Sequence, residues 1–338
     1  MRRKGGLGLV CSLVWLIGAA WPAFAAGEEP AASGPAAAAL AARMNQPYAQ
    51  GGEKTCLTCH NQPPVTLILE GPMALKGDPR TPFAVHGCEA CHGPAGDHAA
   101  GKTGPDGMLI LPPVLFQRPK LEGAAKISSV AERNAVCLSC HESGLRMNWQ
   151  GSPHSNNDIA CTNCHTAHVA KDPVLAKQTQ PKVCFTCHFE QRAQSFEYSH
   201  HPIREGKVVC SDCHNPHGSP GPKQLKEYTV NETCYTCHAE KRGPLLWEHE
   251  PVRENCTNCH NPHGSTQIHL LTERMPYLCQ NCHDTTFHPG EPYSGANTAG
   301  GTFAGAVIAK FQLLGRSCIN CHSQIHGSNN PAGAVFLR

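Results

Sequence analysis

The sequence predicts an elongated, mostly irregular chain of short helices, with little or no β-sheet and with an interior that side chains do not fill. Three features of its composition lead to this prediction. Of the 338 residues, 21 are cysteine and 22 are histidine, aromatic residues make up only 6%, and glycine and proline together number 60. A chain of this length could form two ordinary domains. So few aromatic residues and so much glycine and proline instead argue for short elements and against a large aliphatic core.

The first 25 residues have the pattern of a secretory signal peptide. Arg2, Arg3 and Lys4 precede an apolar stretch over residues 7–20, and Ala-Phe-Ala at 23–25 supplies a cleavage site of small residues. A membrane anchor is the alternative, but the apolar stretch is shorter than a bilayer span. We therefore expect an exported protein located in the periplasm.

Residues 26–50 are rich in alanine, glycine and proline, and we expect them to form a tether. Removal of the signal leaves 25 basic against 26 acidic residues. A chain with almost no net charge lacks the basic surface that recruits nucleic acid, so no nucleic-acid partner is expected.

All 20 cysteines after the signal fall into ten copies of C-x-x-C-H, whereas the composition alone would give well under one copy by chance. This motif attaches c-type haem. Its cysteines lie on one side of a helical turn, where each can form a thioether with a haem vinyl group, and the histidine that follows can ligate the iron. Zinc sites do not need the adjacent histidine, and disulfides at this spacing would cross-link almost nothing.

The sequence therefore predicts a multihaem cytochrome c with ten covalently bound c-type haems that form its core. The predicted attachment residues are Cys56, Cys59, Cys88, Cys91, Cys137, Cys140, Cys161, Cys164, Cys184, Cys187, Cys210, Cys213, Cys234, Cys237, Cys256, Cys259, Cys279, Cys282, Cys318 and Cys321. The predicted proximal iron ligands are His60, His92, His141, His165, His188, His214, His238, His260, His283 and His322.

Twelve histidines lie outside the motifs, and their order reveals five repeat units. Each unit consists of a motif, a histidine, a second motif and another histidine, so ten extra histidines match ten irons. The predicted distal ligands are His86, His98, His154, His168, His200, His217, His249, His263, His288 and His326. The alternative role for these histidines is to bind haem propionates or to cap turns.

Two points of this assignment concern the pair His200 and His201 and the haem that His217 serves. The stretch H-H-P-I-R-E at 200–205 aligns with H-E-P-V-R-E at 249–254, which favours His200 over His201 and leaves His201 and His269 as surface or propionate-binding residues. His217 follows His214 by three residues, which span at most about 10 to 11 Å. This is too short to pass around the edge of one haem, so His217 is expected to ligate a neighbouring haem.

Histidine on both faces of an iron leaves no open position of the kind that catalytic metal sites keep. Ligation by methionine, which raises the haem potential, is not expected, because the methionines after the signal are not placed periodically after the motifs. These methionines are Met44, Met73, Met108, Met147 and Met275. None of the motifs is a C-x-x-C-K. The sequence thus predicts an electron-transfer protein and not an enzyme, with electrons passing from haem to haem.

Several stretches resemble the decahaem periplasmic cytochromes of the MtrA/DmsE/PioA type, over essentially all of residues 51–326. They are C-E-A-C-H-G-P-A-G-D-H at 88–98, C-x-x-C-H-N-P-H-G-S at 210–219 and 256–265, and W-E-H-E-P-V at 247–252. Members of that family are elongated haem chains that lodge inside an outer-membrane β-barrel porin and carry electrons across the membrane. The resemblance implies association with the outer membrane, and as partners a porin, periplasmic electron carriers and an extracellular multihaem cytochrome. It leaves the direction of electron flow open.

The repeat is interrupted by two insertions, at 99–136 and 287–306, which we expect to be surface loops. Divided by haem number alone, residues 51–190 are expected to carry haems 1–5 and residues 191–338 haems 6–10. Two other functions stay open at this point. One is a soluble periplasmic shuttle that feeds a terminal reductase, and the other is a multihaem reductase with one open haem.

Overall fold

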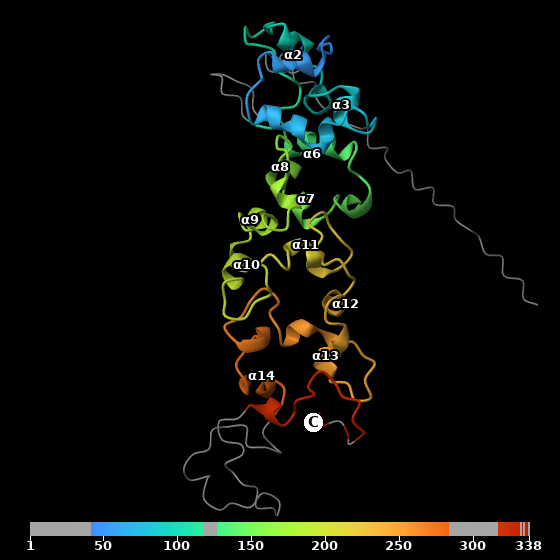
Figure 1. Ribbon diagram of the computed structural model, residues 1–338, viewed down its shortest axis with the longest axis vertical. Helices are drawn as coiled ribbons and strands as arrows, with labels where there is room; N and C mark the ends of the chain where they lie inside the picture. The colour runs from blue at the N-terminus through green and yellow to red at the C-terminus, as the bar shows by residue number, and fades with distance from the viewer. Residues whose placement is uncertain (1–41, 118–126, 284–316, 332, 334, 337–338) are drawn as a thin grey trace, which may run out of the picture.

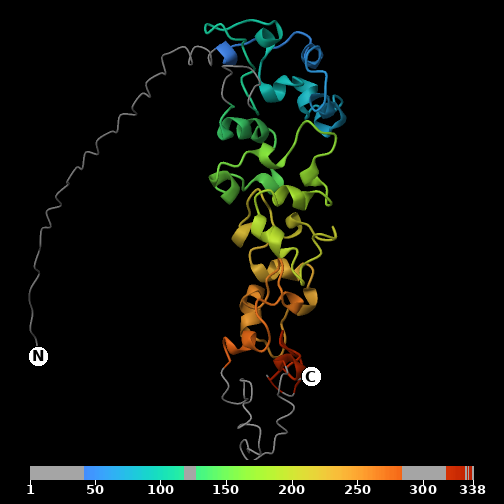
Figure 2. The same ribbon diagram turned by 90° about the vertical axis from the view of Figure 1, so that its left-hand side faces the viewer.

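The computed structural model describes residues 42–117, 127–283, 317–331, 333 and 335–336. These residues form a narrow column in which the chain descends in sequence order, from the N-terminal repeat at one end to the C-terminal repeat at the other (Figure 1). The column is equally narrow in the view turned by 90° (Figure 2). The expected signal peptide, the second insertion and His288 lie outside the described residues.

Short helices connected by turns make up the column, and the longest described helix, α6, has nine residues. The α-helices are α2 (Glu53–Leu57), α3 (Pro82–Val85), α4 (Glu89–His92), α5 (Gly96–Ala99), α6 (Val130–Leu138), α7 (Pro153–Asn156), α8 (Cys161–Cys164), α9 (Gln180–Cys184), α10 (Phe189–Gln194), α11 (Cys210–Cys213), α12 (Val230–Tyr235), α13 (Glu250–Glu254) and α14 (Tyr277–Gln280). The 3₁₀ helices are η1 (Val65–Glu70), η2 (Pro72–Ala74), η3 (Gly144–Arg146), η4 (Pro173–Leu175), η5 (Pro222–Gln224), η6 (Ala239–Lys241), η7 (Cys256–Asn258), η8 (Ile268–Leu270) and η11 (Cys318–Asn320).

Extended structure in the described part of the chain is limited to isolated bridges, such as those between Ser199 and Ser265 and between Trp247 and Ser328. The predicted fold class, an irregular chain of short helices without a β-sheet, is therefore confirmed.

The two motifs of a unit occupy different places in their helices. The first motif starts near the end of a helix whose preceding turn is already formed, as in α6, where Ser129 and Glu132 form a capping box ahead of Cys137. Helices of this kind are α2, α6, α9, α12 and α14. The second motif starts at the beginning of a one-turn helix, and these helices are α4, α8, α11, η7 and η11.

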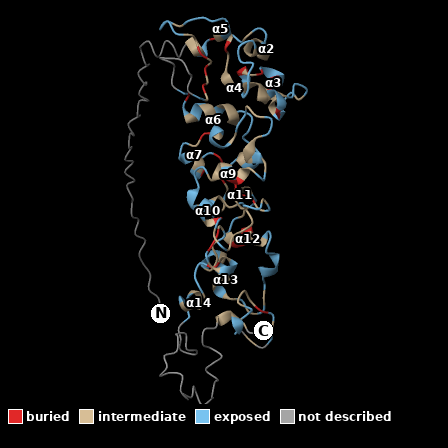
Figure 3. Cartoon of the chain, turned by 60° about the vertical axis from the view of Figure 1, so that its left-hand side comes forward, coloured by how far each residue is buried: buried red, intermediate tan, exposed pale blue. Residues whose placement is uncertain are grey.

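Few apolar side chains are buried. Within the described ranges they are Phe83, Ala95, Leu111, Leu115, Trp149, Ala160, Val209 and Leu271. Buried positions form short, scattered stretches along the column and not one continuous centre (Figure 3). This distribution agrees with the expectation that the polypeptide does not supply a large aliphatic core.

The N-terminal end of the column differs from the expected tether and surface loop. Gln46 is only 5% exposed, and its amide donates a hydrogen bond of 2.7 Å to the carbonyl of Leu111. Arg43 donates hydrogen bonds to the carbonyls of Pro112 and Pro113. Residues 43–49 are therefore packed against residues 109–115 of the first insertion, because buried backbone and amide groups there satisfy one another.

Candidate haem-binding sites

All ten C-x-x-C-H motifs share one backbone hydrogen bond. In each motif the amide of the histidine donates a hydrogen bond to the carbonyl of the first cysteine, over 2.9 to 3.1 Å. This bond closes one helical turn, so the two cysteines of a motif lie on the same side of the turn. The local geometry that thioether attachment to one macrocycle needs is present at every motif.

The histidine of each second motif is oriented by a bond from its Nδ1. Its Nδ1–H donates to a backbone carbonyl or, in one unit, to a carboxylate. The acceptors are Val114 for His92 (3.2 Å), Asp172 Oδ2 for His165 (2.7 Å), Lys223 for His214 (2.9 Å), His269 for His260 (2.8 Å) and Val335 for His322 (2.6 Å). A bond of this kind fixes the tautomer and leaves Nε2 as the metal ligand.

Four histidines outside the motifs also have an Nδ1 beside a backbone carbonyl, and one of them, His200, is described below. The Nδ1 of His98 lies 2.9 Å from the carbonyl of Ile110, and the Nδ1 atoms of His154 and His201 lie 2.7 Å from the carbonyls of Pro216 and Pro262. Each of these imidazoles can therefore also present Nε2 to a metal.

Eight motif histidines each have the ring of one non-motif histidine facing them, at centroid separations of 6.0 to 6.3 Å. The pairs are His60 with His98 (6.3 Å), His92 with His168 (6.2 Å), His165 with His217 (6.0 Å), His188 with His154 (6.1 Å), His214 with His263 (6.1 Å), His238 with His201 (6.3 Å), His260 with His326 (6.0 Å) and His283 with His249 (6.0 Å).

This separation is too wide for ring stacking in van der Waals contact, and it fits a metal ion between two imidazoles. Two metal–nitrogen bonds of about 2 Å each account for about 4 Å. The remaining length of about 2 Å is the sum of the two distances from the bonded nitrogens to the centres of their own rings. The eight pairs therefore have the spacing that a six-coordinate haem iron needs.

Burial gives these imidazoles a protonation state suited to ligation. It lowers the pKa of His92, His168, His214, His217, His249, His263 and His326 below the usual range of histidine. A low pKa favours the neutral ring, which is the form that binds a metal.

Most of the pairs join different repeat units, and they follow one rule. The histidine between the two motifs of a unit faces the first motif of the next unit, as His154 faces His188 and His201 faces His238. The histidine after the second motif faces the second motif of the preceding unit, as His217 faces His165. Consecutive units therefore exchange histidines in both directions.

The segment N-P-H-G-S at 215–219, directly after His214, contains the bonds that connect unit three to unit two. The Asn215 side chain accepts a bond from the amide of His217 and donates to the carbonyl of Gly218, which sets the turn. The carbonyl of Pro216 accepts from His154, and the Ser219 hydroxyl donates to the carbonyl of Leu225.

Gly218 has φ of +99°, and a Cβ placed on it would lie 3.0 Å from the Cβ of Ser152 and would overlap the carbonyl of Asn148. Glycine is needed here because the preceding unit passes so close to the backbone. The expectation that His217 serves a neighbouring haem fits this geometry, since its ring faces His165 and not His214.

The structure corrects the choice between His200 and His201. His201 faces His238, whereas the Nδ1 of His200 lies 2.7 Å from the carbonyl of Glu197 and its Nε2 lies 3.4 Å from Glu205. The alignment with residues 249–254 misled because it ignored the carbonyl of Pro262, which holds only the His201 ring. His201, and not His200, is therefore the candidate ligand.

Three other described histidines lie outside the eight pairs and differ in their surroundings. His269 supplies its carbonyl to His260, so it supports a site through its backbone. His322 belongs to the last motif, and the predicted distal ligand of the same unit, His288, is outside the described residues. His86 stacks on Tyr48, with centroids 4.1 Å apart, and does not face a motif histidine.

Sulfur contacts join the two motifs of each unit. The first cysteines of the two motifs are within hydrogen-bonding reach, and the bond from Cys88 lowers the pKa of Cys56 to about 7. The corresponding pairs are Cys137 with Cys161, Cys184 with Cys210, Cys234 with Cys256 and Cys279 with Cys318. The attachment edges of the two haems in a unit are therefore adjacent.

Cysteines of consecutive units also lie near one another. Burial, together with a nearby cysteine of the next unit, raises the pKa of Cys91, Cys164, Cys213 and Cys259. The nearby cysteines are Cys140, Cys187, Cys234 and Cys282, respectively. Neighbouring attachment sites are thus close enough to interact electrostatically at every step of the column, in sequence order.

Two buried asparagines, which the sequence analysis missed, join the motifs of a unit. Asn231 is 7% exposed, accepts a bond from the amide of Cys256 (2.7 Å) and donates to the carbonyls of Val252 and Arg253. Asn134 does the same for Cys161 and the carbonyl of Ile159. The available signal was an asparagine three residues before the first cysteine in two of the five units.

In the part of the chain that the structure describes, no helix has both the length and the apolar character needed to cross a bilayer.

Comparisons with known proteins agree with this geometry. Residues 200–243 and 249–288 match the family model of the doubled CXXCH motif, and residues 88–183 match the model of NrfB-like c-type cytochromes. The chain is 44% identical over 292 residues to the multihaem cytochrome MtrA of Shewanella baltica, covering 86% of this chain and 83% of that protein. It is 29% identical over 114 residues to the c-type cytochrome NrfB of Haemophilus influenzae, covering 32% of this chain and 47% of that protein.

The repeated motif turns, the facing imidazoles and this extensive similarity lead to one conclusion: the chain belongs to the MtrA family of multihaem cytochromes, electron-transfer proteins with covalently bound c-type haems.

Proposed function

We propose that the chain binds ten haems, one at each C-x-x-C-H motif, and that the facing histidines are the axial ligands of their irons. The non-motif ligands supported by ring pairing are His98, His154, His168, His201, His217, His249, His263 and His326. His288, a predicted distal ligand that belongs to no described pair, is proposed for haem 10. The bound haems supply the one-electron redox chemistry, and the chain holds them in order and keeps both faces of their irons covered.

We further infer that the protein conducts electrons across the outer membrane inside a β-barrel porin. The observation that carries this proposal is the unbroken series of neighbouring cysteines, which places each attachment site near the next along the described column. A narrow column with its redox groups in sequence order has the shape of a conductor between two ends (Figure 1). Irregular backbone can cross lipid only when it is enclosed, and the lumen of a barrel provides such an enclosure.

The location and partners follow from the same proposal. Export by the predicted signal peptide would bring the chain to the periplasm, where periplasmic electron carriers would exchange electrons with one end. The other end would exchange electrons with extracellular metal or with an extracellular multihaem cytochrome. Reduction of an extracellular acceptor and oxidation of extracellular Fe(II) use the same series of haems in opposite directions.

The proposal can be tested by affinity purification of the tagged holoprotein from detergent-solubilised outer membranes. We expect a stoichiometric partner whose gel mobility changes on boiling, as is typical of β-barrels. Recovery of the cytochrome from the soluble periplasm alone, without such a partner, would overturn the conduit and support a soluble shuttle. Haem ligation would be unaffected by that outcome.

A further inference from the structure

Haem site 3, at Cys137, Cys140 and His141, is the exception to the histidine exchange. By the rule that holds for the other units, its second ligand should come from the segment between the two motifs of unit one, residues 61–87. His86 is the only histidine in that segment. Its ring stacks on Tyr48 and does not lie opposite His141, so another side chain of the segment would have to supply the ligand.

Spacing along the chain selects one residue of that segment. His154 and His201 each follow the histidine of the preceding motif by 13 residues, and His249 does so by 11 residues. In unit one, the residue 13 positions after His60 is Met73, whereas His86 follows His60 by 26 positions. Methionine sulfur is an established axial ligand of c-type haem.

The contacts between units select the same residue. In units two to four, the histidine between the two motifs faces the next unit. The residue two positions before this histidine lies against a residue of the next unit. That residue comes one or two positions after the histidine that follows the second motif of the next unit. Ser152 lies against Gly218, Ser199 is bridged to Ser265, and Trp247 is bridged to Ser328.

Unit one has the corresponding contact, in which Gly71 takes the place of Ser152, Ser199 and Trp247. A Cβ placed on Gly71 would lie 3.2 Å from the carbonyl oxygen of Val169, which directly follows His168. Two positions after Gly71 is Met73, so Met73 occupies the place that His154, His201 and His249 occupy in their units.

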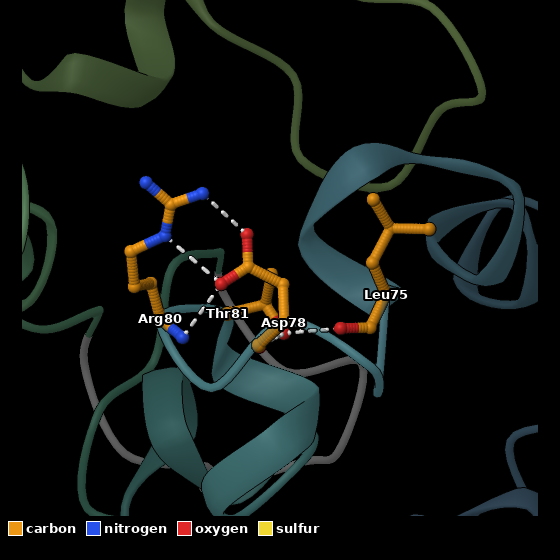
Figure 4. A network of polar contacts seen from close by, with 4 residues as sticks. All are labelled: Leu75, Asp78, Arg80 and Thr81. Carbon is orange, nitrogen blue, oxygen red and sulfur yellow. Dashed lines mark hydrogen bonds and ion pairs between the residues drawn. The ribbon is translucent and has the colours of Figure 1, made fainter.

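The backbone around Met73 is defined by local bonds. Met73 is the central residue of the one-turn helix η2, which packs against α3. The turn that connects these helices is fixed by the Thr81 hydroxyl, which donates to the carbonyl of Leu75, and by the ion pair between Arg80 and Asp78 (Figure 4). Bonds from Arg80 hold the pKa of Asp78 down to about 2, so this pair stays charged at neutral pH.

From this register we propose that the thioether sulfur of Met73 is the axial ligand opposite His141 at haem 3. The expectation that no methionine ligates an iron is then wrong at this one site. Methionine raises the potential of a c-type haem relative to a second histidine. Haem 3 is therefore the first haem of the series to accept an electron, and it holds that electron between haems 2 and 4.

The test uses the purified holoprotein in solution, without a porin, so it can fail or succeed independently of the proposed conduit. In the oxidised protein we expect the far-red charge-transfer band of a thioether bound to ferric haem, with the intensity of one haem in ten. The band should disappear with the first electron added in a reductive titration.

Three variants make the assignment specific. Met73→Leu should abolish the band and convert one haem in ten to high spin, as measured by electron paramagnetic resonance, and that haem should bind one carbon monoxide per chain when reduced. Met73→His should abolish the band, keep all haems low-spin and lower the potential of the first haem to be reduced. Met147→Leu, a change at a methionine that is 70% exposed, should leave all of these signals unchanged.

Haem content, measured for each variant, shows whether the chain has matured. A wild-type protein without the band, or a band that survives Met73→Leu, would overturn the proposal. A single high-spin haem in His86→Ala, with Met73→Leu remaining fully low-spin, would assign the site to His86 instead.

Discussion

Unit one and units two to four place their histidines differently. In units two to four, two histidines of each unit face motifs of other units, so each of these units is connected to its neighbours through the haem sites. In unit one, His98 faces His60 of the same unit, since no unit precedes it. Unit one, at the end of the column, thus places one of its histidines opposite its own motif. Each interior unit places two histidines opposite motifs of other units.

The two regions also differ in what holds them together. Unit one and the first insertion contain Phe83, Ala95, Leu111 and Leu115, which is half of the buried apolar residues of the described chain. Beyond residue 180, the only buried apolar residues of the described chain are Val209 and Leu271, together with the proline Pro181. The end unit therefore contains more polypeptide packing than the interior units, which we expect to depend on their haems.

The largest effect that this comparison predicts follows from production of the chain without haem attachment. We expect the far-UV circular dichroism to lose the helical signal, because little apolar surface is left to bury. Residual protection in hydrogen exchange should be confined to residues 43–117, where the polypeptide core lies. Protection over residues 180–283, or a native-like spectrum, would contradict the proposed dependence on haem.

A smaller effect is expected from His217→Ala, which removes a ligand that connects two units. One haem should become high-spin, and limited proteolysis between units two and three should become several-fold faster, because the chain there opens more often. His98→Ala is the matched control, since it also exposes one iron but breaks no connection between units. Equal proteolysis of the two variants would show that histidine exchange does not hold the column together.

Asn231→Ala tests the buried bonds within an interior unit. It leaves the amide of Cys256 and the carbonyls of Val252 and Arg253 without their partner. The free energy of local opening should fall by about 1 to 3 kcal/mol, the usual cost of buried polar groups that lose their bonds. Hydrogen exchange at Cys256 measures this change. Asn157→Ala, at an exposed residue, should leave the exchange at Cys256 as it is in the wild type.

The smallest effect is expected from Asp172→Asn. The Asp172 carboxylate accepts the Nδ1–H of His165, whereas the other second-motif histidines described donate to backbone carbonyls. A carboxylate partner increases electron donation from the imidazole to iron, so its loss should raise the potential of haem 4. The rise, measured by redox titration, should be smaller than the fall at haem 3 in Met73→His, because no bond to iron is replaced. An unchanged or lower potential would exclude this role of Asp172.

The sequence by itself predicted the fold class, which the structure confirms, and it also gave the proposed sites of haem attachment and the proposed proximal histidines. These features are local: cysteine, cysteine and histidine within five residues form a single turn wherever they occur, and the structure has that turn at all ten motifs. The absence of a β-sheet and of a large aliphatic core from the described residues also agrees with the composition, because a chain rich in glycine and proline and poor in aromatic residues favours neither.

Only the tertiary structure decided which histidine faces which motif. His217 and His165 are 52 positions apart, and their pairing depends on how unit three packs against unit two. The choice of His201 over His200 depends on the carbonyl of Pro262, 61 positions away, and the place of Met73 depends on the contact of Gly71 with Val169. A motif is specified by neighbours along the chain, whereas a ligand pair across an iron is specified by the register between units, which no single stretch of sequence contains.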